Sequence, residues 1–557
     1  MVAMAGCGKA NNNTDGSGNN VDGPDNNAGS AGNNAEADTA AAKLPLNVIE
    51  DKNRTTYEVF VYSFYDSDGD GVGDLRGLIE KLDYINDGDD TTDTDLGCNE
   101  IWLMPVSPSP TYHKYDVTDY MDVDEQYGTL DDFDDLVKEC HDRKVNVIID
   151  LVLNHTSVLH PWFTEAAEFI AEHPEAVTDP DKFLDDEDAD YCPYVEYYNF
   201  SSEKKDGYEP LEGTDFYYEA RFWSGMPDLN LDSPEVRQEI SDITQFWIDH
   251  GVDGFRLDAV TSYYTGDDDR NIEFLTLLND MVKAQKKDAY IVGEAWTNSS
   301  TYHKYYESGI DSFFDFDYAG SEGIIAATVK GSSPAVRFGR ALMGTESEIS
   351  SSDGIDAPFY TNHDMARSCG YYVGKKAMDR VKMAGALNLL MKGNAFIYYG
   401  EELGMKGSGK DENKRAPMYW TADKNSEGNC KGPKDMDSFK MKYPSLSEQE
   451  TDPYSIYNYY KSAIRMRNTF PAIARGSTTV IEELSGDNIC AFLRSHQEYG
   501  DVLVVFNTSE EAALVKISAS TVAGFTEIAF DLETGEERTS FENGNLMLPS
   551  CGIVILR

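Results

Sequence analysis

Short apolar segments alternate with longer amphipathic segments along most of the chain, from Tyr57 onward. The short segments are rich in β-branched and aromatic residues and are bounded by polar turns, which is typical of strands. The longer segments repeat their apolar residues at helical spacing. The predicted strands lie at residues 56–64, 100–105, 146–153, 254–260, 290–296, 312–318, 357–362 and 395–400. Eight strands that alternate with helices predict a (β/α)8 TIM barrel.

Two of the helical segments carry clear start signals. Thr129 and Asp132 have the spacing of a capping box, in which a hydroxyl and a carboxylate each accept a backbone N–H of the first turn. Ser233 is placed to cap a second helix, and Pro234 follows it at the first helical position. Proline suits that position because its missing N–H has no partner there in any helix.

The alternation of strands and helices is interrupted in two places. Residues 156–221 are Tyr-rich and far longer than a βα loop of about 2–6 residues, so we predict an inserted B domain after the third strand. After a last helical segment the chain changes to short strands with polar turns, which predicts a C-terminal antiparallel β-sandwich over residues 474–557. The barrel is then predicted at residues 44–155 and 222–473.

The first 43 residues have a different composition. Residues 11–42 consist mostly of Asn, Gly, Asp, Ser and Ala, which bury too little apolar surface to fold, so they are predicted to form a disordered linker. The preceding "VAMAGCGK" resembles the end of a bacterial lipoprotein signal with Cys7 as the lipidated residue, although Met4 stands where Leu is usual. An unrelated leader is the alternative. The resemblance implies an extracellular protein, anchored to the surface of a bacterial cell only through a lipid.

Composition excludes several classes of function. A formal net charge of -53 makes nucleic acid and anionic lipid headgroups poor partners. No run of about 18 apolar residues is present, so no membrane-spanning helix is predicted. The eight cysteines include no CxxC pair, which argues against a zinc site or an iron–sulfur cluster. We expect a monomer.

The stretch "YDSDGDGVGD" at residues 65–74 places four aspartates and three glycines in one loop. Its opening resembles an EF-hand loop, but the twelfth position is Gly77 and a strand rather than a helix precedes it. Closely spaced carboxylates repel one another unless a cation or water screens them. A loop that binds a hard cation and a solvated polar turn therefore both remain open from spacing alone.

Polar residues gather where the predicted strands end, at "DLVLNH" (150–155), "GFRLDAV" (254–260), "GEAW" (293–296) and "TNHD" (361–364). Arg256 and Asp258 are two residues apart and therefore point to the same side of their strand. Glu294 ends the next strand, so its carboxylate can reach the separation of roughly 5–5.5 Å found in retaining glycosidases. Any one of these residues could be structural, and Asp150 could serve only to support Arg256. Together they indicate an active site, because so many charges in one barrel mouth destabilise the fold.

These four ordered motifs resemble the sequence signatures of the α-amylase family, glycoside hydrolase family 13. The resemblance runs from about Tyr57 to the C-terminus and implies the same barrel, B domain and β-sandwich. It implies Asp258 as nucleophile, Glu294 as general acid/base and Asp364 as the residue that stabilises the transition state. It also implies that the reacting sugar is surrounded by Tyr115, His155, Arg256 and His363.

Two further segments, "MPDLN" (226–230) and "RAPMYW" (415–420), resemble the branch of the family between α-amylases and oligo-1,6-glucosidases. In that branch the first βα loop binds a structural calcium ion, which here implies Asp66, Asp68, Asp70, the carbonyl of Val72, and Asp74 as ligands. Thr261 and Ser262 replace the Lys-His of many α-amylases. This departure argues against a second calcium held through Asn154.

The expected activity is hydrolysis of internal α-1,4-glucosidic bonds in starch and maltooligosaccharides with retention of configuration. An α-1,4/α-1,6-glucosidase or a neopullulanase-like enzyme is the alternative. A non-catalytic sugar-binding protein is a more remote one, since such a protein is expected to lose the nucleophile or the acid. This chain keeps Asp258, Glu294 and Asp364.

Overall fold

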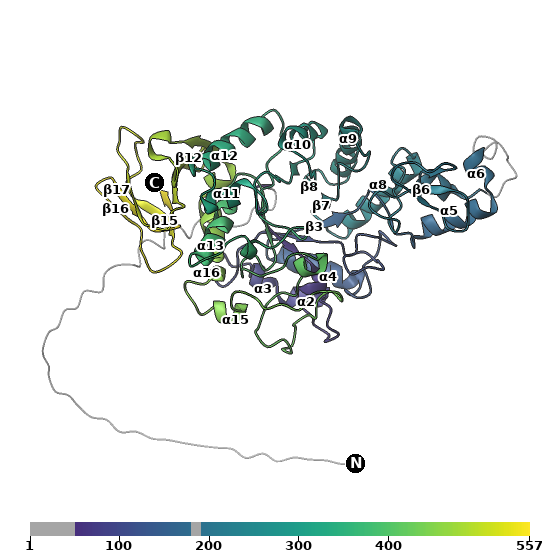
Figure 1. Ribbon diagram of the computed structural model, residues 1–557, viewed down its shortest axis with the longest axis horizontal. Helices are drawn as coiled ribbons and strands as arrows, with labels where there is room; N and C mark the ends of the chain where they lie inside the picture. Colours follow the sequence, from purple (N-terminus) through teal and green to yellow (C-terminus); the bar gives the residue numbers. More distant parts are fainter. Residues whose placement is uncertain (1–50, 180–190) are drawn as a thin grey trace, which may run out of the picture. The chain divides into compact units, whose positions relative to one another are not determined.

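The computed structural model describes residues 51–179 and 191–557 (Figure 1). The predicted linker and the predicted lipidation site at Cys7 lie outside these ranges. None of the helices in the described ranges is long and apolar enough to cross a membrane. The seven cysteines from Cys98 to Cys551 all carry free thiols in this part of the chain.

A parallel sheet of seven strands forms the barrel wall, in the order β10-β1-β2-β3-β7-β8-β9. Its strands are β1 (Thr55–Val59), β2 (Glu100–Leu103), β3 (Asn146–Leu151), β7 (Gly254–Leu257), β8 (Tyr290–Gly293), β9 (Ser312–Phe313) and β10 (Ala395–Tyr398). The interior is filled by a cluster of buried side chains that includes Trp102, Ile148, Tyr290 and Phe396. The predicted TIM barrel is confirmed, and its strands are shorter than predicted because each turns early into the loop that carries its polar residues.

The prediction of a continuous strand at residues 357–362 was wrong. Single parallel bridges join Phe314 to Ala357 and Phe359 to Phe396, so the segment closes the barrel without forming a continuous ladder. Pro358 explains the difference, because proline has no N–H to donate. Its carbonyl still accepts the N–H of Phe396, at 2.8 Å.

Helices cover the outside of the barrel (Figure 1). The longer ones are α2 (Leu75–Glu80), α4 (Leu130–Asp142), α8 (Pro234–Asp249), α9 (Asp268–Gln285), α10 (Ser299–Tyr305), α11 (Ile324–Lys330), α12 (Val336–Ile349), α13 (Ala377–Leu389) and α16 (Ile456–Thr469). Single-turn elements are η1 (Val61–Ser63), α3 (Leu82–Ile85), η3 (Tyr306–Ser308), η4 (Ser368–Gly370), α14 (Asp411–Lys414), α15 (Leu446–Gln449) and α17 (Ala472–Arg475). Both predicted start signals are confirmed: Thr129 and Asp132 form the capping box of α4, and the Ser233 hydroxyl caps α8 ahead of Pro234.

The described part of the segment inserted after β3 contains two helices, a 3-10 turn and a small antiparallel sheet. These are α5 (Pro161–Glu172), α6 (Glu175–Thr178), η2 (Pro193–Tyr197), and strands β4 (Phe200–Ser201), β6 (Tyr217–Glu219) and β5 (Tyr208–Pro210) in that order. Its aromatic residues form a core, in which Phe163 makes edge contacts with Tyr198 and Tyr218. A bridge between His155 and Asp228 ties the end of the segment to the barrel mouth.

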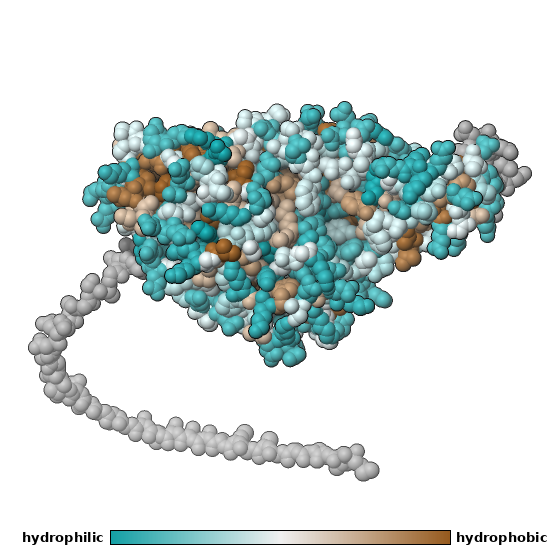
Figure 2. Space-filling model, viewed as in Figure 1, coloured by the Kyte–Doolittle hydropathy of each residue, from teal (hydrophilic) through white to brown (hydrophobic). Residues whose placement is uncertain are grey.

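The C-terminal region is a β-sandwich, as predicted. A sheet of β11 (Ser477–Val480), β12 (Ile489–His496), β13 (Gly500–Asn507), β18 (Ile553–Leu556) and β15 (Ile528–Leu532) faces a sheet of β14 (Ala513–Lys516), β17 (Asn545–Leu548) and β16 (Ser540–Glu542). The turn η5 (Glu482–Leu484) joins β11 to β12. An apolar patch lies on the surface of this region (Figure 2), where Leu514 and Met547 are paired across β14 and β17 and both are exposed.

Candidate active site

A cleft of about 570 Å³ opens at the carboxyl ends of the barrel strands. Five of the residues predicted for the site line it: Tyr115, His155, Asp258, Glu294 and Asp364. The cleft is also lined by His113, Phe222, Trp223, Met226, Ala259, Thr261, Ser262, Trp296, Asp411 and Arg415. Residues that follow β2, β3, β7, β8 and β10 therefore meet in one place with Asp364 and with aromatic residues next to the inserted segment.

Arg256 connects the carboxylates of the site. It is fully buried, and its Nη1 donates to Asp150 Oδ1 at 3.0 Å and to Asp258 Oδ1 at 2.6 Å. Its Nη2 lies 3.0 Å from Glu294 Oε2. One guanidinium thus holds carboxylates that follow β3, β7 and β8, which places Asp258 and Glu294 side by side. Asp150 supports Arg256, as one reading of the sequence had it.

Glu294 is able to carry a proton near neutral pH. Burial is the largest effect and raises the pKa of Glu294 to about 7, the charges of Asp258 and Asp364 raise it further, and Arg256 opposes them. The sequence predicted this direction from the neighbouring carboxylates. The residue after Asp258, Ala259, adopts a left-handed conformation (φ 46°), and its N–H donates to Glu294 Oε2 at 3.2 Å.

Asp364 is held on the opposite side of the site by two cations. Its Oδ2 lies 3.0 Å from His363 Nε2 and its Oδ1 accepts from Arg415 Nη2 at 3.0 Å. Burial would raise the pKa of Asp364, but His363 and Arg415 outweigh it and hold the pKa well below its ordinary value. Asp364 is therefore ionised at every pH at which the protein is expected to work.

His363 is a charged group inside the protein. Burial alone would lower its pKa, but the charges of Asp364 and Glu58 raise it to about 10. Glu58, on β1, lies 2.6 Å from His363 Nδ1. Both ring nitrogens are thus engaged by the protein itself, so His363 orients Asp364 in addition to any contact it makes with a sugar.

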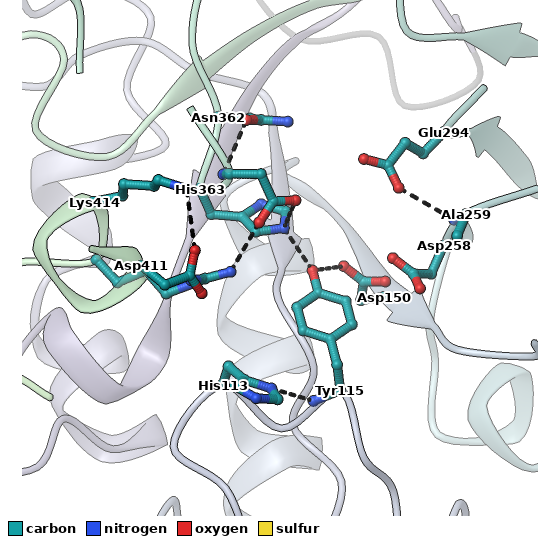
Figure 3. Close-up of polar contacts among 12 residues, drawn as sticks. His113, Tyr115, Asp150, Asp258, Ala259, Glu294, Asn362, His363, Asp411 and Lys414 are labelled. Carbon is teal, nitrogen blue, oxygen red and sulfur yellow. Dashed lines mark hydrogen bonds and ion pairs between the residues drawn. The ribbon is translucent and has the colours of Figure 1, made fainter. Parts of the chain in front are cut away.

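Tyr115 lies between the two sides of the site (Figure 3). Its hydroxyl donates to Asp150 Oδ2 at 2.9 Å and lies 2.8 Å from His363 Nε2. Its ring is stacked on that of His363, with centroids 5.6 Å apart. His155 is buried beside it, with Nε2 3.2 Å from the Tyr115 carbonyl, and burial lowers the pKa of His155. His155 is accordingly neutral.

The aspartate-rich loop follows η1, after the first barrel strand. Among the described residues, Asp66, Asp68 and Asp74 can each place one oxygen within 4.8 Å of the others. Asp70 is not part of that group, and its carboxylate accepts the N–H of Val72 at 2.6 Å. Three convergent carboxylates suit a hard cation such as calcium, which prefers oxygen ligands. The predicted ligand set is brought together only in part.

Asn154 is the residue that would hold the second calcium ion, against which Thr261 and Ser262 argue. Its Nδ2 donates to Asp228 Oδ1 at 3.2 Å, and the N–H of Arg221 donates to the other oxygen of Asp228. Burial is the largest effect that raises the pKa of Asp228, to about 7. The amide of Asn154 thus has a partner within the protein.

Several residues of the cleft were missed from the sequence. Arg415 was quoted only as part of a family motif, although it bonds Asp364 directly. Phe222, Trp223 and Trp296 are 49%, 52% and 54% exposed, which is unusual for large aromatic side chains. The signal for Trp296 was its position two residues after Glu294, on the same side of the chain.

Comparison with known proteins identifies the family of this chain. Residues 58–476 match the family described as alpha amylase, catalytic domain. Alpha-amylase 3 of Dictyoglomus thermophilum is 40% identical and covers 76% of this chain and 79% of its own length. The solved structure of Eubacterium rectale Amy13B is 50% identical with a TM-score of 0.85, over 93% of this chain and 98% of its own. An oligo-1,6-glucosidase of Heyndrickxia coagulans is 28% identical over 82% of this chain and 92% of its own length. The chain belongs to the α-amylase catalytic-domain family and is a glycoside hydrolase.

Proposed function

We propose that this protein is an α-amylase that hydrolyses internal α-1,4-glucosidic bonds of starch and maltooligosaccharides with net retention. The observation that carries the proposal is the pair formed by Asp258 and Glu294 on one guanidinium, with the pKa of Glu294 at about 7. An ionised nucleophile beside a protonated acid is the arrangement that retaining glycosidases require.

In the first step the Asp258 carboxylate forms a bond to the anomeric carbon while the bond from that carbon to the leaving oxygen breaks. Glu294 gives its proton to that oxygen, so the shortened glucan departs as an alcohol. In the second step Glu294, now ionised, takes a proton from water, whose oxygen attacks the same carbon and releases Asp258. Asp364 binds the distorted ring more tightly as positive charge develops on it.

An internal site of cleavage requires room for sugars on both sides of the reacting bond. Trp296 lies on the Glu294 side of the cleft, where the leaving oxygen must be, and Phe222 and Trp223 extend from the inserted segment. Exposed aromatic rings bind the flat faces of sugars by stacking. A location on the cell surface, which the sequence around Cys7 favours, would bring such a cleft to polymeric starch.

The product profile tests this function. We expect rapid internal cleavage of amylose to mixed maltooligosaccharides, with little action on isomaltose, measured by chromatography of early reaction products on amylose, pullulan, maltotriose and isomaltose. Proton NMR of fresh products should show α-anomers. Fast release of glucose from isomaltose would support the glucosidase instead, and an initial β-anomer would contradict the assigned roles of Asp258 and Glu294.

We also propose that the loop of Asp66, Asp68 and Asp74 binds calcium. A cation that links three carboxylates of one loop stabilises the folded state by the free energy of its binding. Chelation of wild-type protein should therefore lower the melting temperature by several degrees, and calcium should restore it. An Asp66→Asn variant should melt at the same temperature with and without chelator. An unchanged melting temperature in wild type, together with no metal by elemental analysis, would favour a polar turn.

A further inference from the structure

Ser63 links the loop that carries the aspartates to the segment that carries Arg415. Its side chain is fully buried at the end of η1, and its Oγ donates to the carbonyl of Arg415 at 2.8 Å. Its own carbonyl accepts the N–H of Met418 at 2.8 Å. Residues 415 and 418 are thus fixed to one serine through both its side chain and its backbone.

The aspartate-rich loop is anchored on both sides of the same serine. The N–H of Gly73 donates to the Tyr62 carbonyl at 2.8 Å and that of Asp74 donates to the Tyr65 carbonyl at 3.1 Å. A Cβ at Gly73 would lie 2.0 Å from the Val61 carbonyl oxygen, so the two backbones are in close contact. Any change in the loop that moves Asp74 is therefore transmitted to the turn that contains Ser63.

On the other side, Arg415 lines the cleft and bonds Asp364 directly. Its guanidinium is almost completely buried, and it pairs with Asp364 and with Asp411. Its Nε has no hydrogen-bond partner within the described residues. The position of the guanidinium therefore also depends on where the backbone of Arg415 is held.

We propose that Ser63 is a positioning residue for the hydrolytic reaction, and that it couples the aspartate-rich loop to Asp364 through Arg415. Occupation of the loop by a cation then improves the alignment of Asp364, in addition to stabilising the fold. The part of the inference that concerns the cation rests on the proposed calcium site. The part that concerns Ser63 and Arg415 rests on hydrogen bonds between protein atoms alone.

A Ser63→Ala variant tests the positioning role. We expect kcat on maltotetraose to fall about 3-fold to 10-fold with KM changed less than 2-fold, because the bonds of Asp364 strengthen in the transition state. The matched control is Ser308→Ala, which removes a buried hydroxyl that donates to the Tyr305 carbonyl at 2.6 Å, far from the cleft. It should lower the melting temperature to a similar extent and leave kcat unchanged. Equal kcat values for the two variants would overturn the proposal.

Removal of the cation tests the coupling between the aspartate-rich loop and Asp364. The first measurement uses wild-type protein. At a temperature at which all forms stay folded, chelation should lower the kcat of wild type about 3-fold to 10-fold and that of Ser63→Ala less than 2-fold. Calorimetric titration with calcium chloride should give Kd values for the two proteins that agree within about 3-fold, since the loop itself is intact. The same kcat ratio in both proteins would overturn the coupling. If calorimetry detects no calcium binding to wild type, the cation site and the coupling fail, and the kcat of Ser63→Ala still decides the positioning role.

Discussion

Replacement of Asp258 by Asn should lower kcat on maltooligosaccharides by about 10⁴-fold or more, the size of effect seen when a nucleophile is removed from other hydrolases. The amide cannot form the covalent bond to the anomeric carbon, and the neighbouring Asp150 is held by both Arg256 and Tyr115. Sugar binding should persist, with a Kd for maltotetraose within about 10-fold of the KM of wild type, measured by calorimetry.

The matched control for this substitution is Asp232→Asn. Asp232 is a solvent-exposed carboxylate paired with Arg270, outside the residues that line the cleft. Its replacement should change kcat less than 2-fold. If the wild type shows no turnover and the Asp258→Asn variant binds sugar equally well, the protein is a sugar-binding protein. That result would contradict the enzymatic assignment.

Glu294→Gln should lower kcat/KM on maltooligosaccharides by about 10²-fold to 10⁴-fold, the usual contribution of a general acid. It should lower kcat/KM much less on an aryl maltotrioside whose phenol is strongly acidic, because that leaving group departs without a proton. Gln keeps the shape of the side chain and the acceptor oxygen for the N–H of Ala259. The contrast between the two substrates therefore reports the missing proton.

The same residue should set the alkaline limit of the wild-type enzyme. The pKa of Glu294 is raised to about 7, so the acid form persists up to that pH and is lost above it. We expect kcat/KM to fall about 10-fold per pH unit well above pH 7, and we expect this limb to disappear in Glu294→Gln. A limb of unchanged position in the variant would assign it to another group. Asp364 contributes no limb above pH 7, because its pKa is held far below its ordinary value.

The meeting of Asp258 and Glu294 in one cleft was predictable because strands have a period of two and barrel sites lie at strand ends. The period of two was enough to place Arg256 and Asp258 on the same side of their strand. The location of barrel sites at strand ends was needed to place Glu294 beside them. Arg415 was not accessible in this way. It lies 51 residues after Asp364, in the loop beyond the last barrel strand β10, and only the fold brings the two together.

Burial was the property that the sequence could not supply. The rise in the pKa of Glu294 was predicted from neighbouring charges, yet burial contributes more. The exposed rings of Phe222 and Trp223 stand near a Tyr-rich segment whose other aromatics form a core, and sequence does not separate the two groups. At Pro358 the apolar pattern predicted a strand that the structure does not complete. A single missing N–H was enough to interrupt it.

The interrupted strand also determines how independently the three carboxylates can change. Asp258 and Glu294 directly follow β7 and β8, so any shift of either one disturbs the hydrogen-bonded ladder. Asp364 follows the segment that closes the barrel by single bridges, and its place is set mainly by Glu58, His363 and Arg415. Substitutions at Glu58 or Arg415 should therefore be able to shift Asp364 while Asp258 and Glu294 keep their positions. Of the three carboxylates, Asp364 is thus the one whose position can change with the least disturbance of the barrel strands.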